Sequence, residues 1–406
     1  MKPFYKILGI LIFSIVQTIG AQTILNSSSD PYLPFSPSLD SLINTVIKAN
    51  KSLIAARELY QVNTLEARTG NAPSNPQVEM GYLFGNPSAI GNRLDFAVYQ
   101  QFDFPTTYVH LARVRDIKLS AAELEYIIKR QNILFRTKQL WIERIYLNKQ
   151  ELLISHRLNQ AEKVADHFQQ RVSSGDIGQF SLNQSNLQTM ALRSEYEQIR
   201  MMASSNQAEL NEICGGIHIE IDDTIFPLPA EFMLDSIVQE YSNSPKMQLF
   251  RRNMELKSQQ KKLTVSKNWP KLSAGYYSEA VLDTKFRGFQ FGISIPLWEN
   301  SNKIKQAKSE IVFAEADTQS FEALQNKEVS QLISQINSLQ VQIESLQNGL
   351  DGINDEQLLS IALDAGEISF TEYLYATELY FRNVQTLFEL KKNHLFREAE
   401  LMKIYL

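Results

Sequence analysis

The sequence predicts an α+β chain in which one unit, a helix followed by a β-hairpin and a very long helix, occurs twice. Three observations support this. Two segments alternate apolar and polar residues with the period of a strand, two proline-free segments are far longer than an ordinary helix, and landmark residues of the first half recur in the second. The hairpin of the second half shows the alternation most clearly.

Residues 271–280 and 288–297 are predicted to form two strands joined by a short polar turn. The second strand places these apolar residues on one face: Phe289, Phe291, Ile293, Ile295 and Leu297. Strands of about 9–11 residues with one apolar face have the length and pattern of tilted membrane-spanning strands. A half-buried hairpin of a soluble protein has the same pattern, so this segment alone leaves both interpretations open.

A second hairpin is predicted over 77–85 and 93–104, with Val78, Met80 and Tyr82 alternating with polar residues. Its landmarks match the other hairpin at one constant offset, in the pairs Pro76 with Pro270, Gly81 with Gly275, and Tyr82 with Tyr276. Matches at nearly the same offset upstream and downstream indicate a duplicated unit. We therefore predict a first repeat over 39–214, a linker over 215–230 and a second repeat over 231–406.

Each hairpin is followed by a very long helix, predicted over 106–172 and 303–363, and then by a returning helix over 179–212 and 370–403. The second long helix carries a coiled-coil seam of Val329, Leu332, Ile336, Leu339, Ile343, Leu346 and Leu350. A helix of roughly 65 residues reaches on the order of 100 Å, beyond the diameter of a globular domain. The helices before the hairpins begin near Leu39 and Leu234.

The N-terminus resembles a secretory signal. Lys2 and Lys6 precede an apolar run, and small residues follow, so we expect a signal peptide over 1–21 and an extended segment over 22–38. The net charge of −5 and the absence of a long basic run make nucleic acid an unexpected partner. No other stretch is apolar enough for a membrane-spanning helix.

Catalysis is not expected. The five histidines show no metal-ligand spacing, and no nucleophile triad, phosphate loop or dinucleotide fingerprint is present. We expect no cofactor and no metal. The lone Cys214 excludes an intramolecular disulfide and is expected to be a small residue at a helix end.

Four membrane strands cannot close a barrel, and open edges in lipid would leave backbone groups unsatisfied at a cost of several kcal/mol each. If the hairpins enter a membrane, the chain must therefore form an oligomer. Phe104, Trp269 and Trp298 lie at predicted strand ends, where a barrel needs aromatic residues at the membrane interface. Ordinary core packing is the alternative for these three.

The chain resembles the TolC-like outer-membrane efflux proteins in the duplicated element order and the glycine-centred reversals. The strand end Ser294–Trp298, followed by Lys303–Ala307, also fits that family. The resemblance implies a homotrimer that builds one 12-stranded β-barrel in outer-membrane lipid, continued by a periplasmic α-helical coiled-coil barrel. It further implies a passive exit duct that docks to a periplasmic adaptor protein and an inner-membrane transporter, for which the resistance-nodulation-division type is one candidate.

The resemblance also implies sites. The periplasmic tip that contacts the adaptor would comprise Gly175, Asp176, Ile177, Gly366, Glu367 and Ile368. An acidic gate residue falls on Glu372, which three copies would bring together around the axis to favour cations. A solvated helix-surface glutamate is the alternative. Tyr375 replaces a second acidic position, Ser181 is the equivalent in the first repeat, and Ile368 stands where some members carry an arginine.

A protein of another class remains open from the residues alone: a secreted coiled-coil scaffold whose hairpins are soluble. The two interpretations differ in whether the apolar strand faces are covered by protein or by lipid. The substrate of a duct cannot be read from its own sequence, because a duct accepts what its pump delivers.

Overall fold

A computed structural model describes residues 37–175, 178–229, 234–298, 300–351 and 356–406. The expected signal peptide and two predicted tip residues, Asp176 and Ile177, lie outside these ranges. The expected extended segment over 22–38 also lies outside them except at its end. There Pro37 and Ser38 are the first two residues of helix α1 and are not extended.

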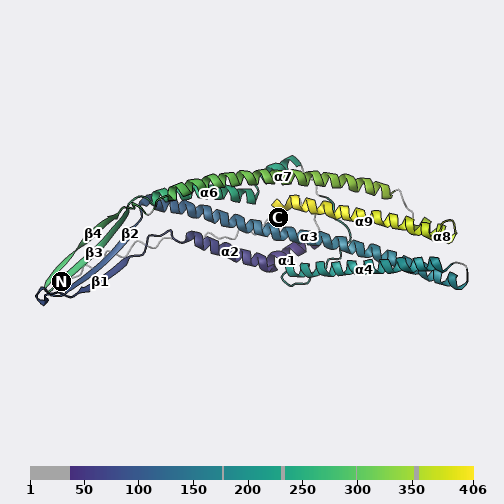
Figure 1. Ribbon diagram of the computed structural model, residues 1–406, viewed down its shortest axis with the longest axis horizontal. Coiled ribbons are helices and arrows are strands. Elements are labelled where there is room, and N and C mark those ends of the chain that lie inside the picture. Colours follow the sequence, from purple (N-terminus) through teal and green to yellow (C-terminus); the bar gives the residue numbers. More distant parts are fainter. Residues whose placement is uncertain (1–36, 176–177, 230–233, 299, 352–355) are drawn as a thin grey trace, which may run out of the picture. The chain divides into compact units, whose positions relative to one another are not determined.

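The helices and strands occur in two sets of similar order, and the second set has one more helix, α8, before its returning helix (Figure 1). The first set is α1 (Pro37–Ala49), α2 (Lys51–Arg68), β1 (Gln77–Leu83), β2 (Arg93–Phe102), α3 (Pro105–Ser173) and α4 (Gln179–Ile213). The second set is α5 (Leu234–Tyr241), α6 (Pro245–Ser266), β3 (Lys271–Val281), β4 (Thr284–Ser294), α7 (Lys303–Asp351), α8 (Glu356–Asp364) and α9 (Phe370–Leu401). Short 3₁₀ turns lie at Ser88–Ile90 (η1) and Met402–Tyr405 (η2).

Several boundaries differ from the sequence expectation. Strands β1 and β2 end at Leu83 and Phe102, before the expected ends at 85 and 104. The last strand runs from Thr284 to Ser294 and not over 288–297, because Leu282 and Asp283 alone form the turn and β4 begins directly after them. The helical segment that begins near Leu39 is divided into α1 and α2 at Asn50. The side chain of Asn50 accepts from the Leu53 backbone N–H at 2.8 Å and caps α2, while its amide donates to the Ile213 carbonyl at 2.7 Å.

The four strands form one antiparallel sheet in the order β1-β2-β3-β4. The two hairpins are joined through β2 and β3, which pair from Arg93 opposite Val281 to Phe102 opposite Leu272. Strands β1 and β4 are therefore the two edges of the sheet within the chain. Each edge presents a row of backbone N–H and C=O groups that the sheet itself does not pair.

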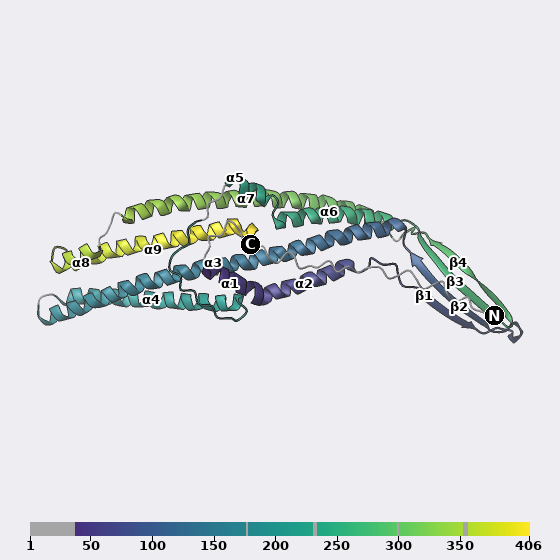
Figure 2. The ribbon, with the colours of Figure 1, turned by 180° about the vertical axis from the view of Figure 1, so that it is seen from behind.

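The helices pack along α3, which contacts α2, α4, α6 and α9, while α7 packs on α6 and α9. Figures 1 and 2 show the sheet at one end of α3 and the α3–α4 turn at the other. Val329 and Ile336 of the predicted coiled-coil seam are buried, and the rest of the seam is half-buried. The seam is thus used within the chain, as α7 packs on α9.

The main hydrophobic core lies midway along the helices and not in the sheet. It centres on Trp141 and Ile145 of α3 and includes residues of α1, α4 and α9. The linker between the repeats also contributes, because Ile221 is buried there and Asn148 of α3 donates to the Ile221 carbonyl at 2.8 Å. Cys214 is buried at the C-cap of α4, and burial raises the pKa of its thiol.

His394 of α9 makes the stability of this region depend on pH. Its side chain is only 5% exposed, and burial lowers the pKa of the imidazole. The neutral form is therefore favoured in the folded chain, so its stabilising contribution is present above the unfolded pKa of about 6.5 and is lost as the pH falls below it. We expect the thermal unfolding temperature to fall on acidification. The variant His394→Gln should flatten this dependence, and an unchanged pH profile in that variant would contradict the assignment.

Candidate functional site

Most of the large apolar residues of the four strands share one face of the sheet. Met80 pairs with Phe96, and Tyr276 pairs with both Val98 and Phe289, so the apolar sets of the two hairpins lie on the same side. Nothing in the described chain covers this face: Phe289 is 82% exposed and Phe291 is 80% exposed. Such a large contiguous apolar surface marks a contact with lipid or with another protein.

The opposite face is polar and carries a network of charged groups. The Arg93 guanidinium donates to both carboxylate oxygens of Asp95, with Nε–Oδ1 and Nη2–Oδ2 distances of 2.8 Å. The Tyr277 hydroxyl donates to Asp95 at 3.2 Å and lies 3.4 Å from Glu279. Further from the turns, Tyr99 of β2 donates to Glu79 of β1 at 2.7 Å. The charged groups of this face are therefore held by specific bonds on three strands.

The predicted interfacial aromatics lie where the sheet meets the helices. Phe104, the N-cap of α3, stacks on Trp269 with ring centroids 4.9 Å apart, although the two residues are far apart in the sequence. Trp298 follows β4 and is exposed. These three rings lie at the junction of strands and helices, and their place at a membrane interface stays a prediction.

The two predicted tip glycines end helices in the left-handed conformation. Gly175 has φ +81° and follows α3, and Gly366 has φ +75° and follows α8. The N–H of Glu367 donates to the Ala362 carbonyl at 2.9 Å, which closes the helix end. Glu367 is exposed and Ile368 is half-buried. A side chain at either glycine would strain the turn, so both positions require glycine for a local structural reason.

A small core joins the two turns. Phe168 of α3, Leu182 of α4 and Phe370 of α9 are buried together. The rings of Phe168 and Phe370 meet edge to face, with centroids 4.6 Å apart. The tips of the two repeats are thus packed on each other within the chain.

Glu372 lies at the start of α9, in a capping box with Ser369. Its carboxylate accepts from the Ser369 N–H at 2.8 Å and from the Ser369 hydroxyl at 2.7 Å, and these bonds lower the pKa of the carboxyl. The side chain is exposed, as is that of Tyr375, whereas Ser181 of α4 is half-buried. Glu372 is therefore ionised at neutral pH and has a structural role in addition to any role in a gate.

The architecture was compared with those of known proteins. No protein-family model and no curated protein sequence matches the chain. Solved structures do match. The outer membrane protein VceC from Vibrio cholerae aligns with a TM-score of 0.77 at 16% identity over 90% of this chain and 95% of its own. The outer-membrane channel OprN aligns with a TM-score of 0.78 at 13% identity over 91% and 90%.

The chain has the fold of the TolC-like outer-membrane channels. CusC, whose crystal structures concern transmembrane channel formation, aligns with a TM-score of 0.74 at 15% identity over 94% of this chain and 95% of its own. At these identities the likeness is one of fold. The resemblance stated from the sequence is confirmed at that level.

One ionic contact in this TolC-like fold was missed by the sequence reasoning. Arg157 of α3 is 6% exposed and donates to Glu378 of α9 at 2.7 Å. Its guanidinium also lies 4.6 Å from the centre of the Phe381 ring. An arginine among the apolar positions of the long helix was the available signal, but its partner is more than two hundred residues away in the sequence.

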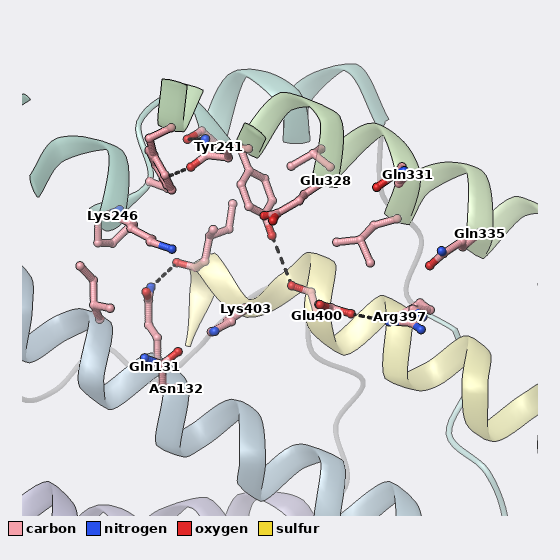
Figure 3. Close-up of a pocket in the computed structure, with 18 residues that line it drawn as sticks. Gln131, Asn132, Tyr241, Lys246, Glu328, Gln331, Gln335, Arg397, Glu400 and Lys403 are labelled. Atoms are coloured by element: carbon pink, nitrogen blue, oxygen red, sulfur yellow. Dashed lines mark hydrogen bonds and ion pairs between the residues drawn. The ribbon is translucent and has the colours of Figure 1, made fainter. Parts of the chain in front are cut away.

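A cavity of about 480 Å³ lies where the start of α6 meets the end of α9 (Figure 3). Tyr241 donates to the Leu401 carbonyl at 3.0 Å, and Gln131 donates to the Ile404 carbonyl at 2.8 Å. These bonds satisfy carbonyl groups that a helix leaves unpaired at its end. Burial raises the pKa of Tyr241 and lowers that of Lys403. The polar residues Tyr241 and Gln131 therefore hold the end of α9 and the turn η2 against α5 and α3.

Among the described residues, no three His, Cys, Asp or Glu side chains are grouped closely enough to hold a metal ion. No helix in the described ranges is both long and apolar enough to cross a membrane.

Proposed function

We propose that the chain is the outer-membrane exit duct of a tripartite efflux pump. It would conduct substrates passively from the periplasm to the outside, with no catalysis of its own. The observation that supports this most directly is the two-faced sheet, whose apolar side is uncovered and whose polar side holds a bonded charge network. A lipid-facing exterior and a water-filled interior require this division.

The open edges support a homotrimer. Strands β1 and β4 run in opposite directions in the β1-β2-β3-β4 sheet, so β4 of one copy can pair with β1 of the next and continue the antiparallel order. Three copies would then form a closed 12-stranded barrel without an unpaired edge, which the bilayer demands. Strands β3 and β4 have 11 residues each, close to the roughly 9–11 residues that span a bilayer when tilted.

The helices would extend the barrel into the periplasm. α3 alone has 69 residues, which at about 1.5 Å per residue is on the order of 100 Å. The tip formed by the turns at Gly175 and Gly366 would then meet a periplasmic adaptor protein, and through it an inner-membrane transporter supplies the energy. The resistance-nodulation-division type remains a candidate for that transporter.

The rival interpretation, a secreted scaffold with soluble hairpins, is disfavoured by the same sheet. A soluble hairpin buries its apolar face on a core, but here Phe289, Phe291 and Met80 are all strongly exposed, and the main core lies in the helices. Exposed phenylalanines on edge strands would also promote aggregation in water.

The decisive experiment is extraction followed by planar-bilayer recording. We expect the full chain to fractionate with outer membranes, to require detergent for extraction, to migrate as a trimer and to give discrete conductance steps. A chain that remains in solution without detergent and produces no conductance would contradict the duct.

The proposed role of Glu372 in a charge gate can be separated from its role in the capping box. Glu372→Gln removes the charge, but glutamine also fits a capping box. Ser369→Ala removes the cap, at a local cost of about 0.5–2 kcal/mol, and keeps the charge. If three Glu372 side chains line the tip, only Glu372→Gln should reduce the cation preference measured from reversal potentials in a salt gradient. Equal behaviour of the two variants would count against a charge gate.

A further inference from the structure

The charges on the polar face of the sheet are unequal in number and concentrated at one end. Arg93, Asp95, Tyr277 and Glu279 form what we call the outer network, next to the β1–β2 and β3–β4 turns. Glu79 shares this face, because it pairs with Ala97 and Ala97 pairs with Tyr277. Asp95 and Glu279 thus lie near one guanidinium, and Glu79 lies four residues along β1 from the position opposite Arg93. The other basic residue of this face within the described strands, Lys271, is at the opposite end of β3.

Arg93 is committed mainly to one of these carboxylates. It forms a two-bond fork with Asp95, whereas its Nε lies 3.5 Å from Glu279, which a hydrogen bond of good geometry does not reach. Glu279 lies 3.4 Å from the Tyr277 hydroxyl, whose single proton is directed to Asp95 at 3.2 Å, and Glu79 accepts from Tyr99. A hydroxyl group donates a bond without cancelling a charge. Each chain therefore keeps negative charge at this end of the polar face.

The outer network lies on β2 and β3, the two strands through which the hairpins of the two repeats pair. Asp95 of β2 pairs with Glu279 of β3, so two carboxylates lie on directly opposite residues, an arrangement that destabilises a sheet unless a cation lies between them. Arg93 supplies that cation. Its removal would leave both carboxylate side chains in place without the cation that lies between them.

We propose that the outer network is a charge filter that favours cations over anions at the outer end of the duct, and that Arg93 is the residue limiting its strength. This inference rests on the proposed function, because the polar face becomes a lumen only in a closed barrel. Three copies would place three networks around one water-filled passage. Rings of carboxylates in a narrow passage between low-dielectric walls raise the local concentration of cations.

The experiment uses the full-length trimer in planar bilayers with a KCl gradient. Glu279→Gln removes one negative charge per chain and keeps the size of the side chain, so the zero-current potential should move towards zero. Arg93→Gln removes the positive charge, while Asp95 keeps its bond from Tyr277, so the potential should move the opposite way, towards stronger cation preference. Misfolding cannot produce shifts of opposite sign.

The matched control is Arg287→Gln. Arg287 pairs with Ser278, which pairs with Phe96, so it lies on the apolar face near the same end of the sheet. The same loss of an arginine there should leave the reversal potential unchanged. Salt provides a second control: at 1 M the screening length is about 3 Å, so all four proteins should conduct alike.

The outcomes are distinct. A wild-type protein that does not conduct overturns the duct itself. A conducting protein whose reversal potential is the same in the wild type, Glu279→Gln and Arg93→Gln overturns the filter and leaves the duct standing. An equal shift in Arg287→Gln overturns the assignment of the two faces.

Discussion

Phe289→Arg is expected to prevent assembly of the trimer in the membrane. Phe289 lies at the middle of β4, on the apolar face, and packs edge to face against Tyr276. An arginine at the midplane of a bilayer, on the lipid face of a barrel strand, costs about 2–4 kcal/mol. Three copies would carry this cost together. The measurement is the amount of trimer in the outer-membrane fraction, and we expect it to be lost or strongly reduced.

Gln290→Arg is the matched control for this variant. Gln290 is the next residue of the same strand and lies on the polar face opposite Gly275, so an arginine there points into water in a closed barrel. We expect nearly normal amounts of trimer. If both variants assemble equally well, or if Gln290→Arg is the more damaging, lipid does not contact the face that carries Phe289.

Glu378→Ala is expected to loosen the contact between the two repeats. The substitution leaves Arg157 6% exposed and without the carboxylate that it contacts at 2.7 Å, although the Phe381 ring remains beside it. Losing a hydrogen bond to a charged group costs about 1.5–3 kcal/mol, which corresponds to roughly 10- to 100-fold faster amide exchange where opening is local. Hydrogen exchange of α3 and α9 amides near the pair measures this directly.

Arg382→Ala serves as the control, since Arg382 contacts the same carboxylate from the helix surface. That pair is solvent-exposed on both sides, with an N–O distance of 3.5 Å, and pairs of this kind contribute about 0–1 kcal/mol. We expect little change in exchange. Equal effects of the two substitutions would mean that burial of Arg157 does not matter to the contact.

The hairpins and their faces could be predicted from the sequence because alternation is a local signal. Phe289 and Phe291 fall on one face whatever the strand pairs with, and the duplicated Gly81 and Gly275 relate the two hairpins. The start of β4 was harder to predict from the sequence. The polar residues around Leu282 resemble a longer turn, but the sheet extends the pairing to Val281 opposite Thr284 and leaves a two-residue turn.

Contacts between distant segments could not be predicted from periodicity. Asn50 caps α2, but its role as an interruption follows from its bond to the Ile213 carbonyl, which requires the end of α4 to lie beside it. The pairing of Arg157 with Glu378 and the stacking of Phe104 on Trp269 likewise depend on how the repeats meet. For Glu372, the sequence indicated an acidic residue near the tip, but its bonds to Ser369 came only from the structure.

The separation of the helical core from the uncovered sheet has a consequence for how the protein matures. The core around Trp141 and Ile145 is formed by residues of a single chain, so its formation does not require another copy. Within one chain the edge strands β1 and β4 have no further strand to pair with, and the apolar face of the sheet is exposed. The folding free energy of the sheet therefore includes the association of subunits and transfer into lipid. Maturation is then expected to begin as a first-order process in the helices and to finish as a concentration-dependent one in the strands.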